Sequence, residues 1–407
     1  NDTALAALAD GFTSIIIGNG TTVANAGTGE HAIAIDSATF SDPVYFKAPA
    51  GAGSITIAGG LNGTGDSSIQ IDGSGTTTTL SSDIQTDGGN VSIYDSVLID
   101  GVRTIDTENG DNGPAGSILI TGTIDANTDN TDTLTCDVRG TSDNTIEFQS
   151  NLGSTTELGG ITCYGSTIDT ADLSIDSGNI VLSGSQINLN STTFQTTTSG
   201  NIELTGPVTV SAGGAVSVTA ADSLTFILPG ANTSFTSNQN ISFSGTNIYV
   251  DDNTDAGGFT YTIDTSTAGA NITINNVLDN SAGDTGANTL ILDAGAGNVT
   301  VSAAVGSTTA LGSFDVNSAN QVTLADVTTN AGDVQIGNSA ADRPAVLILQ
   351  GDLTSQSGAG AGNINLHSDE IRLTANGGTD DTITLNTDGT ADGNALLTTA
   401  AAGLTSS

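Results

Sequence analysis

The sequence predicts an all-β protein that folds as a right-handed parallel β-helix, a β-solenoid with coils of roughly 20–35 residues. Three observations predict this class. Short apolar–polar alternations recur along the whole chain, and no window shows a convincing helical apolar period. The apolar residues are mostly Ile, Val, Leu and Ala, with many Thr, a mixture that suits half-buried strands. The 53 Gly, with abundant Asn, Asp and Ser, supply turns at short intervals.

The alternations share a five-residue pattern, Gly/Ala-Asn/Asp-φ-x-φ, in which φ is aliphatic or Phe. Its copies and close variants are GNVSI (89–93), GSILI (116–120), GNIVL (178–182), GNIEL (200–204), GAVSV (214–218), QNISF (239–243), ANITI (270–274), GNVTV (297–301), GDVQI (332–336) and GNINL (362–366). Further strand-like pieces lie between them: SIQI (68–71), TIEF (145–148), LSI (173–175), NIYV (247–250), TLIL (289–292) and QVTL (321–324). We expect GNVTV and GDVQI to occupy the same wall of the solenoid.

Stacking explains why such pieces repeat. One coil cannot bury its inward Val, Ile and Leu alone, whereas coils stacked about 4.8 Å apart form parallel sheets around a continuous aliphatic core. The alternative, a string of β-sandwich domains, usually shows a core Trp or Tyr, but this chain has no Trp and only five Tyr. The composition therefore favours the solenoid.

The repeat pattern also predicts the domain organisation. Residues 1–60 are expected to form N-terminal capping coils, and residues 61–407 one continuous β-solenoid. Irregular inserts are expected near residues 101–115, 125–170 and 222–265. The only helical candidate is ALAALAD (4–10), which ends directly before Gly11.

The charge of the chain excludes several partners. The net charge is −39, from 44 acidic residues against five basic ones, and such a surface repels nucleic acid and anionic membranes. No apolar run approaches the roughly 18 residues that would span a bilayer, so we expect no membrane insertion. Most acids are Asp, and their simplest interpretation is solvating charge on turns.

The chain begins at Asn1, as a processed segment would, and its composition favours an extracellular or cell-surface location.

The two cysteines, Cys136 and Cys163, are separated by one typical coil, the same interval as from Gly89 to Gly116. Residues at matching positions of adjacent coils have Cα atoms about 4.8 Å apart, inside the range that a disulfide accepts. The spacing therefore predicts a disulfide between neighbouring coils, and two free buried thiols are the alternative.

Calcium is the one ligand that a sequence pattern suggests. Asp-x-Asn-x-Asp occurs at Asp125, Asn127 and Asp129, and again at Asp251, Asn253 and Asp255, and alternating oxygen ligands on a short loop suit hard cations. Neither copy has the distal Glu of an EF-hand, and about one such match is expected by chance in this composition. A structural Ca²⁺ and a chance match therefore both stay open, and no other cofactor is expected.

Catalytic patterns are absent from the sequence. Parallel β-helices that degrade acidic polysaccharides place Lys or Arg beside clustered Asp, whereas this chain has five scattered basic residues. The acid pairs Asp251-Asp252 and Asp380-Asp381 are typical of turns. His31 and His367 have no nucleophile pattern or second imidazole nearby. We expect a protein that is not an enzyme.

The stretch GNVTVSAAVGSTTALGSFDVNSANQVTL (297–324) resembles the repeats of filamentous-haemagglutinin-type β-solenoids in very large secreted bacterial surface proteins. VGSTTALGS (305–313) is similar to the middle element of these repeats. The segment ALADGFTSIIIG, which ends at Gly18, is similar to the segment that opens such solenoids. DPVYFKAPAGAGSITIAGGL (42–61) is similar to their early coils. The resemblance implies a right-handed parallel β-helix, secretion, and a role in adhesion, surface coating or fibre formation. The family has no shared catalytic residues to carry over.

These observations predict a non-enzymatic extracellular structural protein, a filament, sheath or surface-coat solenoid. Solenoid ends expose strand edges, and the strand TSIIIG near the N-terminus and the apolar NALLTTAAAGLTSS at the C-terminus predict head-to-tail self-association. The alternative is an adhesin segment that binds glycans or a cell surface through irregular inserts near residues 101–115 and 251–260.

Overall fold

The fold is given by a computed structural model. The structure describes residues 11–18, 32–48, 53–65, 67–73, 75–110, 113–252, 258–282, 288–339, 341–355, 362–374, 382–387 and 394–406, with side chains in the last range only as far as residue 398. Every regular element in these ranges is a β-strand, and the strands pair in parallel. The prediction of an all-β parallel solenoid is confirmed.

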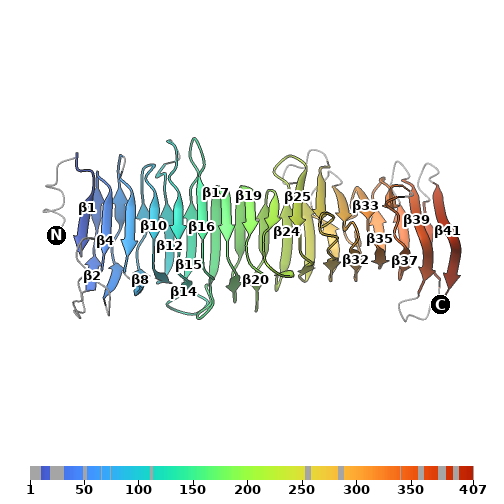
Figure 1. Cartoon of the computed structure of the whole chain (residues 1–407), viewed down its shortest axis with the longest axis horizontal. Coiled ribbons are helices and arrows are strands. Elements are labelled where there is room, and N and C mark those ends of the chain that lie inside the picture. The colour runs from blue at the N-terminus through green and yellow to red at the C-terminus, as the bar shows by residue number, and fades with distance from the viewer. Residues whose placement is uncertain are drawn as a thin grey trace. The chain divides into compact units, whose positions relative to one another are not determined.

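The chain divides into two compact units. Unit 1 comprises residues 1–190 and 195–200, and unit 2 comprises residues 191–194 and 201–407. The strand β20 (Thr193–Thr196) falls at this division. Within each unit, consecutive strands return coil after coil to the same ladders, and neighbouring strands run side by side (Figure 1).

Three parallel ladders build unit 1. The first contains β1 (Ile15–Gly18), β4 (Val44–Lys47), β7 (Ile69–Asp72), β10 (Val91–Ile93), β13 (Ile118–Ile120), β16 (Thr145–Phe148) and the second halves of β17 (Gly160–Thr170) and β19 (Ile180–Leu189). The second contains β2 (Ala32–Ile35), β5 (Ser54–Ile57), β8 (Thr77–Leu80), β11 (Ser96–Ile99) and β14 (Ile124–Ala126), and single bridges at Leu152 extend it to β18 (Leu173–Ile175). The third contains β3 (Ala38–Phe40), β6 (Leu61–Gly63), β9 (Ile84–Gln85), β12 (Val102–Asp106), β15 (Thr133–Asp137) and the first halves of β17 and β19.

Unit 2 has the same construction. Its first ladder contains β22 (Val208–Val210), β25 (Thr233–Ser237), β28 (Thr260–Asp264), β31 (Thr289–Asp293), β33 (Ser313–Ser318), β36 (Val334–Ile336) and the starts of β39 (Ile364–Leu373) and β41 (Ala395–Ser406). Its second contains β23 (Val216–Thr219), β26 (Ile241–Ser244), β29 (Ile272–Ile274), β32 (Asn298–Val301), β34 (Gln321–Leu324), β37 (Val346–Leu349) and the ends of β39 and β41. Its third contains β21 (Ile202–Thr205), β24 (Ser223–Ile227), β27 (Asn247–Asp251), β30 (Leu278–Asn280), β35 (Val327–Thr329), β38 (Leu353–Ser355) and β40 (Leu385–Asn386), with a bridge at Val305 between β30 and β35.

Alternation along each strand separates the core from the surface. The inward residues, such as Ile69, Val91 and Ile118 of one ladder, are completely buried or nearly so, and the residues between them are half-exposed. Each buried aliphatic side chain contributes roughly 1.5–3 kcal/mol to stability, and stacking supplies the cover that no single coil could provide. The coils differ in length, because the step between register partners is short from Ile168 to Ile187 and much longer from Ile371 to Leu404.

The core of unit 2 contains an aromatic cluster in a chain with few aromatic residues. Phe226, Phe235, Phe243 and Tyr261 lie on four strands, with ring centroids 4.8–6.3 Å apart in stacked and edge-on pairs. All four side chains are fully buried. The Tyr261 hydroxyl is also buried and has no hydrogen-bond partner among the described residues.

One expectation about the walls is wrong. GNVTV forms β32 in the second ladder of unit 2, whereas GDVQI forms β36 in the first ladder. The pattern begins strands on all three ladders, because its Gly-Asn pair suits any corner at which two coils approach closely. Copies one coil apart, as in β29 and β32, do share a ladder.

The segments expected to be irregular contribute paired strands. Residues 101–115 include β12, residues 125–170 include β15, β16 and β17, and residues 222–265 include β24 to β28. The helical candidate at 4–10 lies outside the described residues. In the part of the chain that the structure describes, no helix is long and apolar enough to cross a membrane.

Candidate functional site

The Asn of the recurring pattern links neighbouring coils. In unit 2, Asn240 Oδ1 accepts a hydrogen bond from the backbone N–H of Asn271 at 2.8 Å, and Asn271 Oδ1 accepts one from the N–H of Asn298 at 2.8 Å. Asn298 Oδ1 in turn accepts a hydrogen bond from Asn320 Nδ2 at 3.1 Å. These side chains stand just before a strand or, at Asn298, on its first residue, where the backbone turns and its N–H groups need partners.

The same link recurs at other corners. Asn90 Oδ1 accepts a hydrogen bond from the backbone N–H of Ser117 at 2.8 Å, and Asn201 Oδ1 accepts one from the N–H of Ser223 at 3.1 Å. Asp333 accepts from the N–H of Asn363 at 2.7 Å, and this Asn accepts from the N–H of Asn394 at 3.2 Å. Sequence reasoning identified the pattern as a turn signal but missed this role. The signal was present in the constant placement of Asn or Asp before the first φ position.

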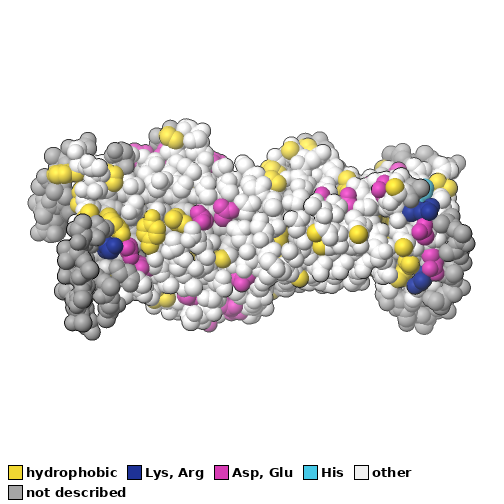
Figure 2. All heavy atoms as spheres, viewed as in Figure 1, with side chains coloured by type: hydrophobic (Ala, Val, Ile, Leu, Met, Phe, Trp, Pro, Cys, Tyr) yellow, Lys and Arg dark blue, Asp and Glu magenta, His cyan; other side chains and the backbone are white. Residues whose placement is uncertain are grey.

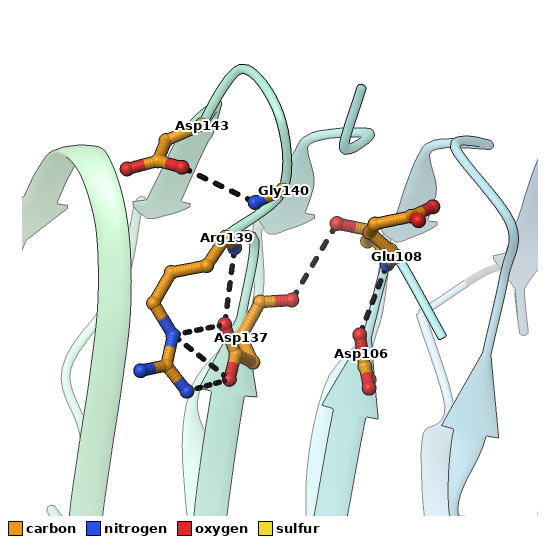
Figure 3. Close-up of polar contacts among 7 residues, drawn as sticks. Asp106, Glu108, Asp137, Arg139, Gly140 and Asp143 are labelled. Carbon is orange, nitrogen blue, oxygen red and sulfur yellow. Dashed lines mark hydrogen bonds and ion pairs between the residues drawn. The ribbon is translucent and has the colours of Figure 1, made fainter. Parts of the chain in front are cut away.

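Acids at strand ends close turns. Asp106 and Asp137 are register partners at the ends of β12 and β15 (Figure 3). Asp106 Oδ1 accepts the N–H of Glu108 at 2.9 Å, and Asp137 Oδ1 accepts the N–H of Arg139 at 3.0 Å. The Arg139 guanidinium also binds the Asp137 carboxylate at 2.5 Å and lies 4.1 Å from the centre of the Tyr164 ring. At this corner the acidic side chains therefore accept hydrogen bonds from backbone N–H groups, and Asp137 also forms an ion pair with Arg139.

All five cations of the chain lie beside carboxylates. The pairs are Lys47 with Asp72 at 3.2 Å, Arg103 with Asp83 at 4.0 Å, Arg139 with Asp137 at 2.5 Å, Arg343 with Asp369 at 2.5 Å and Arg372 with Glu370 at 2.8 Å. On the face that Figure 2 shows, the dark-blue cations lie close to magenta acids. Since 44 acids face five bases, most of the negative charge has no cation to balance it.

The first predicted calcium ligands serve the neighbouring coils. Asp125 lies on β14, and its Oδ1 accepts the N–H groups of Thr155 at 2.8 Å and Thr156 at 3.3 Å. Asn127 Nδ2 donates to Asp100 Oδ1 at 3.1 Å, and Asp129 is exposed. Two of the three side chains are thus engaged in contacts between coils.

The second predicted calcium group is only partly described. Asp251 ends β27 and is half-buried, whereas the adjacent Asp252 is fully buried. Asn253 and Asp255 lie outside the described residues. Among the residues that the structure describes, no three His, Cys, Asp or Glu side chains are arranged to hold a metal ion.

Of the remaining residues considered for catalysis, the structure describes only His367. His367 is half-exposed on β39 and is the register partner of Thr398 on β41. His31 and the pair Asp380-Asp381 lie outside the described residues.

Cys136 and Cys163 are brought together as the spacing predicts. They are register partners on β15 and β17, both are fully buried, and the structure holds them as free thiols. Burial, first, and then a hydrogen bond with Cys136 raise the pKa of the Cys163 thiol well above its usual value. The bridge itself stays a prediction.

Asp315 is an acid that sequence reasoning did not single out. It projects from β33 between Ile291 and Gln335, and its Oδ1 atom is buried without a hydrogen-bond partner among the described residues. Burial, first, and then the negative charges of Asp293 and Asp333 raise its pKa to about 6. Only the register of three coils brings these acids together, so no local sequence signal could have revealed them.

Exposed apolar side chains gather in the first and last coils. Among the described residues six large hydrophobic side chains are exposed: Phe12, Ile16, Tyr94, Val102, Leu396 and Leu397. Four of them lie in or next to β1 and β41. Leu397 is 41% exposed, although its register partner Leu366 is completely buried, because no described strand covers β41 from outside.

Comparison of the chain with models of known protein families, with curated proteins and with solved structures finds no match in any of the three.

Proposed function

We propose that the protein is a non-enzymatic extracellular structural protein whose solenoid coils associate end to end into a filament, sheath or surface coat. The placement of exposed apolar side chains in the first and last coils carries this proposal. The resemblance to filamentous-haemagglutinin-type repeats supports secretion and a surface role. The side chains at the corners support a structural role, because they bind the next coil.

The strand edges at the two ends suit each other. In the described part of the chain, β1 pairs only with β4, and β41 pairs only with β39. The outer edge of each strand carries backbone N–H and C=O groups that can continue a parallel ladder. We expect β41 of one copy to receive β1 of the next, so that Leu396 and Leu397 are covered by the incoming coil. Because such a contact is heterologous, it adds copies without closing a ring.

The acidic surface favours growth at the ends over lateral clumping. Faces with uncompensated negative charge repel one another, whereas end contacts rest on backbone hydrogen bonds and aliphatic burial. Salt screens the repulsion, with a Debye length of about 10 Å at 0.1 M. End-to-end association should therefore strengthen as ionic strength rises.

Sedimentation velocity over a concentration series tests the proposal. The chain is expected to form species that grow in size with concentration and with added NaCl. Leu397→Asp, which places a charge in the uncovered end coil, should shift the distribution towards single copies. Val102→Asp is the matched control, because Val102 is 68% exposed and lies away from both ends. Single copies at every concentration, or equal effects of the two substitutions, would reject end-to-end assembly.

A further inference from the structure

The third ladder of unit 1 contains one interruption in an otherwise aliphatic column. Its inward positions run from Ile84 through Ile105 to Cys136, Cys163 and Leu182. All five side chains are completely buried. The only two cysteines of the chain therefore occupy the same inward position of two consecutive coils.

This placement meets the geometric requirement for a bridge. Neighbouring parallel strands lie about 4.8 Å apart, and a disulfide accepts Cα separations of about 4.4–6.8 Å. The two side chains leave their strands on the same side, because register partners in a parallel ladder face the same way. The bond requires no change of register.

The surroundings of the thiols decide when the bond can form. A thiolate is the nucleophile in disulfide exchange, and both cysteines are inaccessible to solvent in the folded unit. In the unfolded chain the thiols are exposed and have an ordinary pKa of about 8.5. Oxidation is therefore expected while the coils are still open, and reduction is expected to need the coils to open again.

We infer that Cys136 and Cys163 form a disulfide staple between β15 and β17 that closes during folding and is then sealed in the core of unit 1. The oxidant is a small-molecule disulfide of the glutathione class. One cysteine thiolate attacks its S–S bond, forming a mixed disulfide and releasing one small thiol. The second cysteine thiolate then attacks the protein sulfur of that mixed disulfide, forming the Cys136–Cys163 bond and releasing the second small thiol. Two electrons pass to the oxidant, whose two thiols carry the two protons.

The staple is a property of one copy and is independent of end-to-end assembly. It encloses the segment between the two cysteines, which includes β16 and the corner of Arg139. A covalent link here prevents two consecutive coils from separating. Oxidised protein is therefore expected to melt roughly 5–10 °C above reduced protein.

Intact-mass analysis after alkylation tests the staple. Reduced protein is divided into two samples. One sample stays native and receives oxidised glutathione without unfolding. The other is unfolded in guanidinium and is then refolded in the presence of oxidised glutathione. Both are then denatured and treated with iodoacetamide without reductant. The refolded sample should gain no carbamidomethyl group and should weigh two hydrogens less than the reduced chain. The native sample should gain two such groups.

Two results would overturn the inference. Two carbamidomethyl groups on the refolded sample would show that the bridge does not form. Equally fast oxidation of the native sample would show that the pair is not sealed. The double variant Cys136→Ala/Cys163→Ala is the control for the melting measurement, because its melting temperature should be the same after oxidising and reducing preparation.

Discussion

Gly297 approaches the preceding coil so closely that a Cβ atom on it would lie 2.2 Å from the carbonyl oxygen of Ala270. Both residues begin a copy of the recurring pattern, and the strands that follow them pair in register. The Gly is therefore required by the distance between two coils. Gly297→Ala should lower the free energy of unfolding by about 2–3 kcal/mol, because backbone must move to admit the methyl group.

Urea unfolding of unit 2 measures this effect, and Gly213→Ala is the matched control. Gly213 is exposed, and a Cβ there would meet no atom within 4 Å. The free energy of unfolding of Gly213→Ala should be unchanged or should rise by up to about 1 kcal/mol. Equal losses in the two variants would argue against close approach as the reason for the Gly.

Asn90→Ala should destabilise unit 1 by about 1 kcal/mol. The change leaves the N–H of Ser117 in the next coil without the side-chain oxygen that accepts its hydrogen bond. Chemical denaturation measures the loss. Asn190→Ala is the comparison, because Asn190 is exposed and follows β19 rather than starting a strand. A loss in the control as large as in Asn90→Ala would mean that the link between coils contributes little.

Tyr261→Phe should stabilise unit 2. The Tyr261 ring stacks on Phe226, and its hydroxyl is buried without a hydrogen-bond partner in the described structure. Such a group costs about 1–3 kcal/mol. Removing it keeps the ring and should raise the free energy of unfolding by about 1 kcal/mol. The half-exposed Tyr249 gives the control variant Tyr249→Phe, which should change stability little. A destabilised Tyr261→Phe protein would indicate that the hydroxyl has a partner after all.

Acidification through pH 6 should stabilise unit 2 through Asp315. Its folded pKa is raised to about 6 from an ordinary value of 3.8, so the folded state binds the proton more tightly than the unfolded state. The contribution of Asp315 to the free energy of unfolding therefore rises as pH falls from about 7 to about 4, and it is lost as pH rises through 6. Asp315→Asn should be more stable than the natural chain at pH 7.5, and the difference should shrink towards pH 4.

Urea midpoints across this pH range check the Asp315 prediction. Asp129→Asn is the control for the loss of one negative charge, because it removes that charge from an exposed position. If the stability difference between Asp315→Asn and the natural chain is the same at pH 7.5 and pH 4, the partly buried and negatively charged environment of this carboxyl is contradicted.

The strands and the core could be predicted because both depend on local alternation. Pieces such as SIQI, TIEF and QVTL stand alone between turn residues, and they form β7, β16 and β34 respectively. The pairing of Cys136 with Cys163 was also accessible, because the interval between them is one that the recurring pattern repeats, as from Gly89 to Gly116.

The walls and the surface clusters could not be predicted in the same way. Coils of unequal length shift the register unpredictably, so the sequence pattern predicts one wall for GNVTV and GDVQI although they lie on two. The same uncertainty hid the meeting of Asp293, Asp315 and Asp333 from three coils. Segments without the pattern, such as residues 125–170, pair as strands because aliphatic inward positions suffice without its Gly and Asn.

Electron microscopy of the purified chain at high concentration and raised ionic strength tests end-to-end assembly most directly. The proposal predicts unbranched filaments of uniform width, which become shorter and rarer in Leu397→Asp and stay unchanged in Val102→Asp. Separate particles of single-copy size at every concentration would contradict it.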